Sequence, residues 1–270
     1  MSQRPASWRD HADRGVEVPP VPGHDAPAFY RPIGEFQGAD YRRNAFARGT
    51  REELAALRSL VDLDAGTRVL DVGCGDARHL RALAADGVVG TGIDVSPGLI
   101  EAGRAAAAAA DVEVGLEVGD ARDLPVVLGG RAGTFDVVWS LCQGALGTSP
   151  ASDPAVLAGM AAATRPGGAV VLTVFHALFA VRHLVPGDAF DPVHLVHHQV
   201  SEVHGPDHQR RSFDLWTAAY TARDAVRLVT EAGLMVEDVR GAEPGAYGRR
   251  GPGEVGLDDP ELLVLAHRPA

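Results

Sequence analysis

The sequence has few cysteines and no long uninterrupted hydrophobic run. Only Cys74 and Cys142 occur among 270 residues, so a disulfide framework is not expected and a reducing cytoplasm is the expected location. The most apolar stretch, residues 169–181, is too short and too interrupted to cross a bilayer, so no membrane partner is predicted. The first residues lack a basic stretch followed by an apolar one, so no signal peptide is predicted.

Positive charge is also scarce. The chain has 25 lysine and arginine residues against 36 aspartate and glutamate residues, which gives a formal net charge of -11. A nucleic-acid partner requires basic surface to neutralise phosphates, so no such partner is predicted. Hydrophobic residues make up 46%, and the length suits one large α/β domain with a small appendage. The oligomeric state stays open between a monomer and a homodimer.

The first 49 residues are predicted to form an arm and a lid segment beside a main domain of residues 50–270. Residues 1–27 are rich in proline, glycine and charge and are expected to be mobile or loosely docked. The aromatic-rich residues 29–46 either pack on the main domain or close over a ligand. Thr50 followed by Glu53 has the pattern of a capping box and predicts a helix over residues 50–63.

From residue 68 onward, short β-rich runs alternate with helical stretches. Strands are predicted at 68–72, 88–95, 112–118, 135–140 and 169–175, with helices at 77–86, 97–110 and 154–164. This alternation predicts a doubly wound α/β fold with a mostly parallel sheet covered on both faces. Later strands at 194–203, 212–221, 235–241 and 261–267, with a helix at 222–232, add antiparallel pairs and an insert over about 176–221.

The first predicted strand ends at Asp71 and continues into a helix through Gly73, Cys74 and Gly75. A Gly-x-Gly turn lets a ligand approach the backbone closely, although the same pattern occurs in plain tight turns. A dinucleotide fingerprint has a third small residue where Arg78 stands. The bulky Arg78 and the acidic Asp71 therefore favour a cationic ligand over a diphosphate.

The next strand ends carry further candidate side chains. Asp94 lies roughly 20 residues past the glycine turn, the spacing at which such folds hold ribose hydroxyls, although a helix-capping acid is the alternative. Asp120 follows the third strand near the switch point of the sheet. The fourth strand leads into residues 140–143, and a turn at residues 165–168 precedes the fifth strand.

This ordered series of motifs resembles the class I S-adenosylmethionine (SAM)-dependent methyltransferases over about residues 50–175. The motifs are Val69–Gly75, Gly92–Ser96, Gly119–Ala121, Phe135–Val138 and Arg165–Gly168. The resemblance implies a Rossmann-like seven-stranded sheet with an antiparallel C-terminal hairpin, SAM as the cofactor, and a small molecule as the methyl acceptor. It implies these cofactor-binding residues: Asp71, Gly73, Cys74, Gly75, Asp94, Val95, Asp120, Ala121, Arg122, Ser140, Leu141, Gln143 and Arg48.

Methyl transfer from SAM mainly requires in-line alignment and the exclusion of water. Where the acceptor loses a proton, His176, just past the fifth strand, is the predicted base, with a structural hydrogen-bonding role as the alternative. The spacing of the histidines from His194 to His208 does not fit a zinc site, so no metal is predicted. Cys142 is interpreted as a pocket wall. Two other functions stay open: a non-catalytic SAM-binding protein and an NAD-dependent dehydrogenase.

Overall fold

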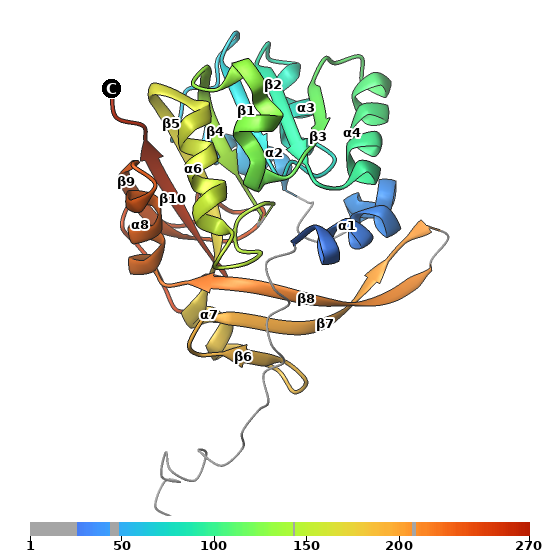
Figure 1. Ribbon diagram of the computed structural model, residues 1–270, viewed down its shortest axis with the longest axis vertical. Helices are drawn as coiled ribbons and strands as arrows, with labels where there is room; N and C mark the ends of the chain where they lie inside the picture. Colours follow the sequence, from blue (N-terminus) through green and yellow to red (C-terminus); the bar gives the residue numbers. More distant parts are fainter. Residues whose placement is uncertain (1–25, 44–48, 143, 207–208) are drawn as a thin grey trace, which may run out of the picture.

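The computed structural model describes residues 26–43, 49–142, 144–206 and 209–270. Of its ten strands, three form an insert, which leaves seven in the core sheet in the order β3-β2-β1-β4-β5-β10-β9 (Figure 1). Strands β1 to β5 are parallel, and β10 is antiparallel to both neighbours. The predicted doubly wound fold with its antiparallel hairpin is therefore confirmed. The core strands are β1 (Arg68–Val72), β2 (Val89–Asp94), β3 (Gly115–Val118), β4 (Phe135–Ser140), β5 (Thr164–His176), β9 (Met235–Ala242) and β10 (Glu261–His267).

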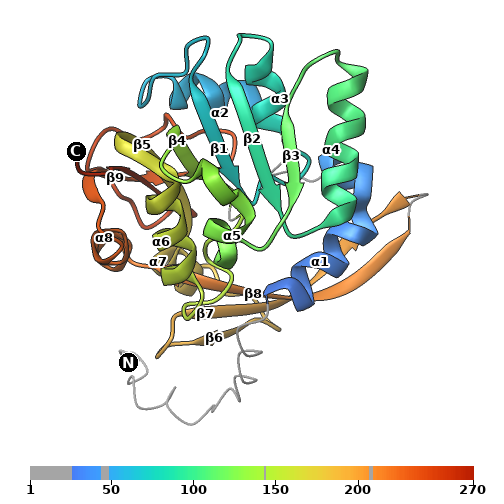
Figure 2. The same ribbon diagram turned by 45° about the horizontal axis from the view of Figure 1, so that its top comes forward.

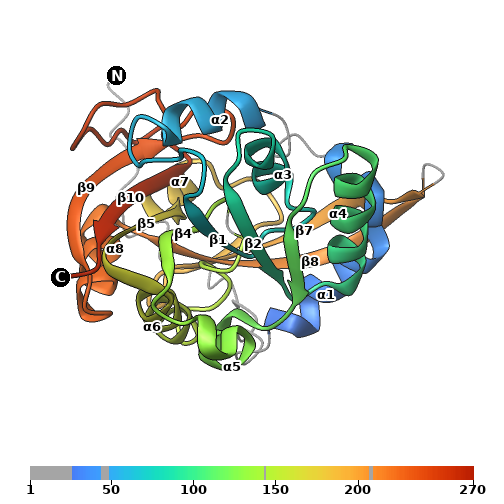
Figure 3. The same cartoon turned by 90° about the horizontal axis from the view of Figure 1, so that it is seen from above.

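Helices cover both faces of this sheet, as Figure 3 shows from above. One face packs on α2 (Thr50–Leu57), α3 (Arg78–Ala84) and α4 (Pro97–Ala109). The other packs on α5 (Leu124–Leu128), α6 (Asp153–Ala163) and α8 (Ala222–Glu231). Successive strand residues alternate between the two cores, so that Val69 belongs to the first and Leu70 to the second. Burial on both faces explains why inner strands such as β4 and β10 are almost continuously apolar.

Helix starts follow local sequence signals in two places and depart from them in a third. Ser96 caps α4 by accepting a hydrogen bond from the amide of Leu99, with Pro97 in the first helical position. Thr221 caps α8 in the same way. The predicted capping box at Thr50 is wrong, because Thr50 is already helical and the left-handed Gly49 precedes it. Helix α2 also ends at Leu57, short of the predicted residue 63.

The insert is an antiparallel three-stranded sheet that lies across the carboxyl ends of the core strands (Figure 1). It consists of β6 (Ala189–Asp191), β7 (Val196–His204) and β8 (Arg210–Tyr220) and follows α7 (Ala177–Arg182). Strand β8 joins the core sheet by pairing with the last two residues of β5. The insert therefore places one of its faces over the edge of the sheet where ligands bind in such folds.

The N-terminal segment adds a second cover over the same edge. Helix α1 (Ala26–Gln37) lies between α4 and the insert (Figure 2), and the 3-10 turn η2 (Gly38–Arg43) follows it against α4. The packing on α4 is close at Gly34, where an added Cβ would lie 2.4 Å from Oγ of Ser96. A side chain at residue 34 would therefore push α1 away from the end of β2. The arm predicted for residues 1–27 lies outside the described residues as far as residue 25.

Candidate functional site

The candidate site is a crevice at the carboxyl ends of β1, β2 and β4, where the strand order reverses. Two cavities open there, one of about 440 Å³ and one of about 40 Å³. Both are lined by Tyr30, Gly73, Asp94, Val95 and Gly144. One elongated ligand can therefore extend from the smaller cavity into the larger.

Two glycines bring the walls of this crevice into direct backbone contact. An added Cβ on Gly73 would lie 2.1 Å from the carbonyl carbon of Gly144, and Gly73 has a left-handed φ of 79°. Gly75 also has a positive φ, and an added Cβ there would lie 3.3 Å from the Tyr41 ring of η2. At residue 73 only glycine allows both the positive φ and the close approach to the Gly144 backbone. The Gly-x-Gly turn therefore reverses the chain and also forms part of the crevice wall.

Asp94 lies at the centre of the crevice. Its Oδ2 accepts a hydrogen bond of 2.8 Å from the amide of Gly75, and its Oδ1 accepts one of 2.8 Å from the amide of Ser96. Burial raises the pKa of Asp94 to about 6, although these two amides partly offset it. A carboxylate has about four acceptor positions, so two remain for ligand hydroxyls. The alternative that Asp94 acts only as a cap is not required, because the Ser96 hydroxyl caps α4.

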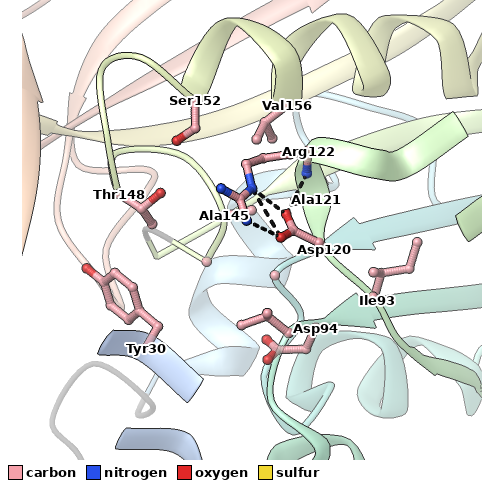
Figure 4. A pocket seen from close by; sticks show the side chains of 14 residues that line it. Tyr30, Ile93, Asp94, Asp120, Ala121, Arg122, Ala145, Thr148, Ser152 and Val156 are labelled. Carbon is pink, nitrogen blue, oxygen red and sulfur yellow. Dashed lines mark hydrogen bonds and ion pairs between the residues drawn. The ribbon is translucent and has the colours of Figure 1, made fainter. Parts of the chain in front are cut away.

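The smaller cavity is lined by the charged side chains of Asp94, Asp120 and Arg122 together with small and apolar side chains (Figure 4). Arg122 and Asp120 form an ion pair, and its hydrogen bonds lower the pKa of Asp120. Apart from Asp94 and Tyr30, the other lining residues are small or apolar and include Ile93, Ala121, Ala145, Thr148, Ser152 and Val156. Because Arg122 already neutralises Asp120, the cavity suits a flat, uncharged ring system.

Four of the predicted cofactor-binding residues lie beneath the crevice and line neither cavity. Asp71 is 2% exposed, and its Oδ2 has no hydrogen-bond partner among the described residues. Ser140 is fully buried and accepts a hydrogen bond from the amide of Ala145. Cys74 and Leu141 pack in the core. Two other predicted residues, Arg48 and Gln143, lie outside the described residues.

His176 also lies away from both cavities. Its side chain is 1% exposed, and its Nδ1 is 3.0 Å from the carbonyl oxygen of Asp259, which accepts its hydrogen bond. The reason is the alternation along β5, which turns Phe175 into the larger cavity and His176 away from it. The structure therefore does not bring the predicted base to the crevice, and its structural alternative describes it better.

A different histidine lines the larger cavity. His197 of β7 lies there with Gln199 and Ser201, and Thr217 of β8 faces the same space. Nε2 of His197 is 2.9 Å from Oδ2 of Asp188. The sequence analysis treated His197 only as one of the histidines whose spacing does not fit a zinc site. The period of two from residue 197 to residue 201 indicates a common face, but only the position of the insert shows which face that is.

Arg78, which takes the place of a third small residue, is held by an ion pair across the crevice wall. Its Nη1 lies 2.6 Å from Oε2 of Glu53, and Nε2 of His79 lies 2.8 Å from the same oxygen. Burial of Glu53 acts to raise its pKa, but hydrogen bonds from His79 and Arg78 overcome this and lower it to about 2. Cys142 lines the larger cavity beside Arg78, and burial raises the pKa of its thiol to about 12. A wall residue fits Cys142 better than a nucleophile.

Comparison with known proteins agrees with this geometry. Residues 69–168 match the family model of a methyltransferase domain. The chain is 34% identical over 113 residues to the ubiquinone biosynthesis O-methyltransferase of Xanthomonas axonopodis pv. citri, covering 42% of this chain and 44% of that protein. It is 39% identical over 88 residues to the 27-O-demethylrifamycin SV methyltransferase of Amycolatopsis mediterranei, covering 32% and 31%. The chain thus spans less than half the length of these curated relatives.

Among solved structures, the CcbJ methyltransferase from Streptomyces caelestis superposes with a TM-score of 0.70 at 18% identity, covering 88% of this chain and 98% of that chain. Residues 69–168 therefore match a methyltransferase domain, and the chain has the fold of solved SAM-dependent methyltransferases, whose cofactor is SAM, in agreement with its motifs. Within the described ranges, no helix is both long and apolar enough to cross a membrane.

Proposed function

We propose that this protein transfers the methyl group of SAM to a hydroxyl group of a small molecule. The observation that carries the proposal is the position of Asp94, whose fixed carboxylate faces both cavities at the end of β2. Ribose hydroxyls suit its remaining acceptor positions, and the adenine ring suits the smaller cavity, where small side chains such as Ala121 lie beside the paired Asp120 and Arg122. The named O-methyltransferase relatives support a hydroxyl acceptor.

The residues present fit this cofactor. Gly73 leaves the backbone open to close approach, and Asp94 supplies negative charge near a ligand that carries a positive one. When bound, SAM supplies a methyl group activated by its sulfonium, whose sulfur keeps the electron pair of the broken bond. The chain then has to bind the acceptor in line and exclude water. Tyr30, Ile33 and Tyr41 of the N-terminal segment line the larger cavity and support a lid role for it.

A nicotinamide-dependent dehydrogenase fits less well. Arg78 is a long side chain at the position of the third small residue, and its guanidinium is already committed to Glu53. The smaller cavity also offers an ion pair between Asp120 and Arg122 rather than a free cation for a phosphate. Non-catalytic SAM binding is the remaining alternative, and a turnover assay separates it from transfer.

The test is incubation of the purified protein with methyl-labelled SAM and a panel of hydroxylated aromatic and macrocyclic compounds. Formation of S-adenosylhomocysteine together with a labelled methyl ether supports transfer. The matched panel of amine analogues distinguishes O-methylation from N-methylation. Tight SAM binding without turnover on any acceptor of the panel would favour a binding protein.

A further inference from the structure

We propose that His197, held by Asp188, is the base that removes the proton from the acceptor hydroxyl. This inference rests on the proposed function and deepens it, since it assigns the acceptor side of the site to the insert. The side chains of His197 and Asp188 are 10% and 11% exposed, so the pair is largely removed from water. Asp188 comes from the turn before β6, and His197 from β7, so the pair exists only because the insert folds as a sheet.

The hydrogen-bond partner of Nε2 determines which tautomer of the His197 ring is present. A carboxylate only accepts hydrogen bonds, so Nε2 carries the proton that is donated to Asp188 over 2.9 Å. In the neutral ring, Nδ1 then holds the unshared electron pair. Within the described residues, Nδ1 of His197 makes no hydrogen bond. The ring is parallel to Phe175 within 4°, at a centroid distance of 6.2 Å, which fixes its plane.

The position of His197 suits an acceptor bound beside the cofactor. It lines the same cavity as Asp94, Gly73 and Cys142, so that cavity joins the cofactor crevice to the insert. Gln199, Ser201 and Thr217 add a polar strip, and the apolar side chains of Ile33, Phe175 and Leu215 line the rest. An acceptor with one hydroxylated edge and an apolar body matches this lining.

The proton balance of the step is complete with these groups. The acceptor oxygen forms the new bond to the methyl carbon, and the sulfur takes the electron pair of the carbon–sulfur bond. The hydroxyl proton passes to Nδ1 of His197, and the resulting imidazolium is paired with the carboxylate of Asp188. Other acidic groups that face the cavity are Glu202 and Glu261, and Asp94 lies at its cofactor end.

The next residue along β7 provides a matched control. Nε2 of His198 lies 2.8 Å from Oδ1 of Asp214, a pair of the same chemistry. Its side chain stacks on Trp216 on the opposite face of the insert and does not line either cavity. His198→Gln therefore removes a histidine–aspartate pair from the same strand without touching the proposed acceptor site.

The test uses 4-nitrophenol, whose phenolate absorbs visible light and whose pKa lies near neutrality, added to protein saturated with S-adenosylhomocysteine. At about pH 7, where an ordinary histidine is mostly neutral and part of the 4-nitrophenol is still protonated, we expect added protein to increase phenolate absorbance. The increase should persist in His198→Gln and fall at least tenfold in His197→Gln, whose amide can still donate to Asp188. Asp188→Asn should give a smaller increase than the wild type.

Two results would overturn the assignment: no increase with wild-type protein, or an equal increase with His197→Gln. The second result would assign the proton to another group in the cavity, such as Glu261. Calorimetric binding of S-adenosylhomocysteine to each variant is measured separately and reports folding of the site. If the wild type does not bind S-adenosylhomocysteine, the proposed function itself is contradicted. If the wild type binds it normally but gives no phenolate signal, only the role of His197 is contradicted.

Discussion

Arg78 and Glu53 form a buried ion pair that joins the first turn of α3 to α2, with 2.6 Å between Nη1 and Oε2. The Glu53 side chain is fully buried, and Arg78 is 11% exposed. Glu53 also accepts hydrogen bonds from His79 and from the amide of Gly245, so one carboxylate connects three segments. These contacts make Glu53 a structural support for the wall of the crevice.

We expect Glu53→Gln to lower the free energy of unfolding by about 3 kcal/mol, because removing one partner leaves Arg78 as an uncompensated buried charge. Urea unfolding measures this change. Glu52→Gln is the matched control, since Glu52 is an exposed neighbour whose pairing with Arg51 is exposed too, and it should change stability by less than about 0.5 kcal/mol. Equal stability of Glu53→Gln and the wild type would contradict the role of this pair.

Gly73→Ala should both destabilise the protein and weaken binding of S-adenosylhomocysteine by at least about tenfold. The new Cβ would collide with the backbone of Gly144, so one of the two crevice walls has to move. Gly66→Ala is the control, because residue 66 has a similar left-handed φ of 88° but nothing within 4 Å of the added Cβ. Gly66→Ala should lower the free energy of unfolding only by the conformational cost of about 1–2 kcal/mol, and it should bind S-adenosylhomocysteine normally. Equal effects of the two substitutions would argue against a packed contact at Gly144.

Cofactor affinity should fall as the pH drops below about 6, the raised pKa of Asp94. Protonation removes the negative charge and an acceptor position, so the dissociation constant should rise by up to about tenfold per pH unit. Stability of the free protein has the opposite sign at this group: a raised carboxyl pKa favours folding at low pH, and this gain is lost as pH rises through about 6. Calorimetry between about pH 5 and 8 tests the affinity, and Asp94→Asn should flatten the profile.

Asp153 should add its own pH dependence to stability. Burial raises its pKa to about 7, although hydrogen bonds from Tyr220 and the amide of Gly147 partly offset this. The folded state therefore binds an extra proton between the unfolded pKa of about 4 and about 7, and stability should decline as pH rises across this window by at most about 1.4 kcal/mol per unit. Urea unfolding of Asp153→Asn should show a smaller decline, while an unchanged slope would contradict the assignment to Asp153.

The sequence predicts the central sheet well because its inner strands are buried on both faces and bounded by turn residues. Strands β4 and β10 have the predicted limits, and α4 starts at the predicted cap. The capping box at Thr50 was wrong because tertiary partners override a local signal: Arg78 and His79 bind the Glu53 carboxylate that would have closed the box. The residues around Thr50 alone do not show that Arg78 and His79 bind the Glu53 carboxylate.

The candidate site was likewise predicted only in part from the sequence. Gly73, Gly75 and Asp94 line the crevice as the sequence predicted, because the ends of parallel strands meet at one edge of the sheet, and their cofactor-binding role stays a prediction. His176, the predicted base, lines neither cavity, because one step along a strand reverses the face of a side chain and Phe175 takes the cavity side at the end of β5. The place of His197 depends on an insert that folds back across the crevice, which no local pattern encodes.

The central claim is that the crevice holds a nucleoside through Asp94 rather than a diphosphate on the glycine turn. Isothermal titration calorimetry with S-adenosylhomocysteine, SAM and NAD tests it most directly, on the wild type and on Asp94→Ala. We expect both SAM-type ligands to bind the wild type, NAD to give no heat, and Asp94→Ala to lose at least about tenfold in affinity with the loss of hydrogen bonds to a charged acceptor. Binding of NAD, or equal affinity of the variant for S-adenosylhomocysteine, would contradict the account.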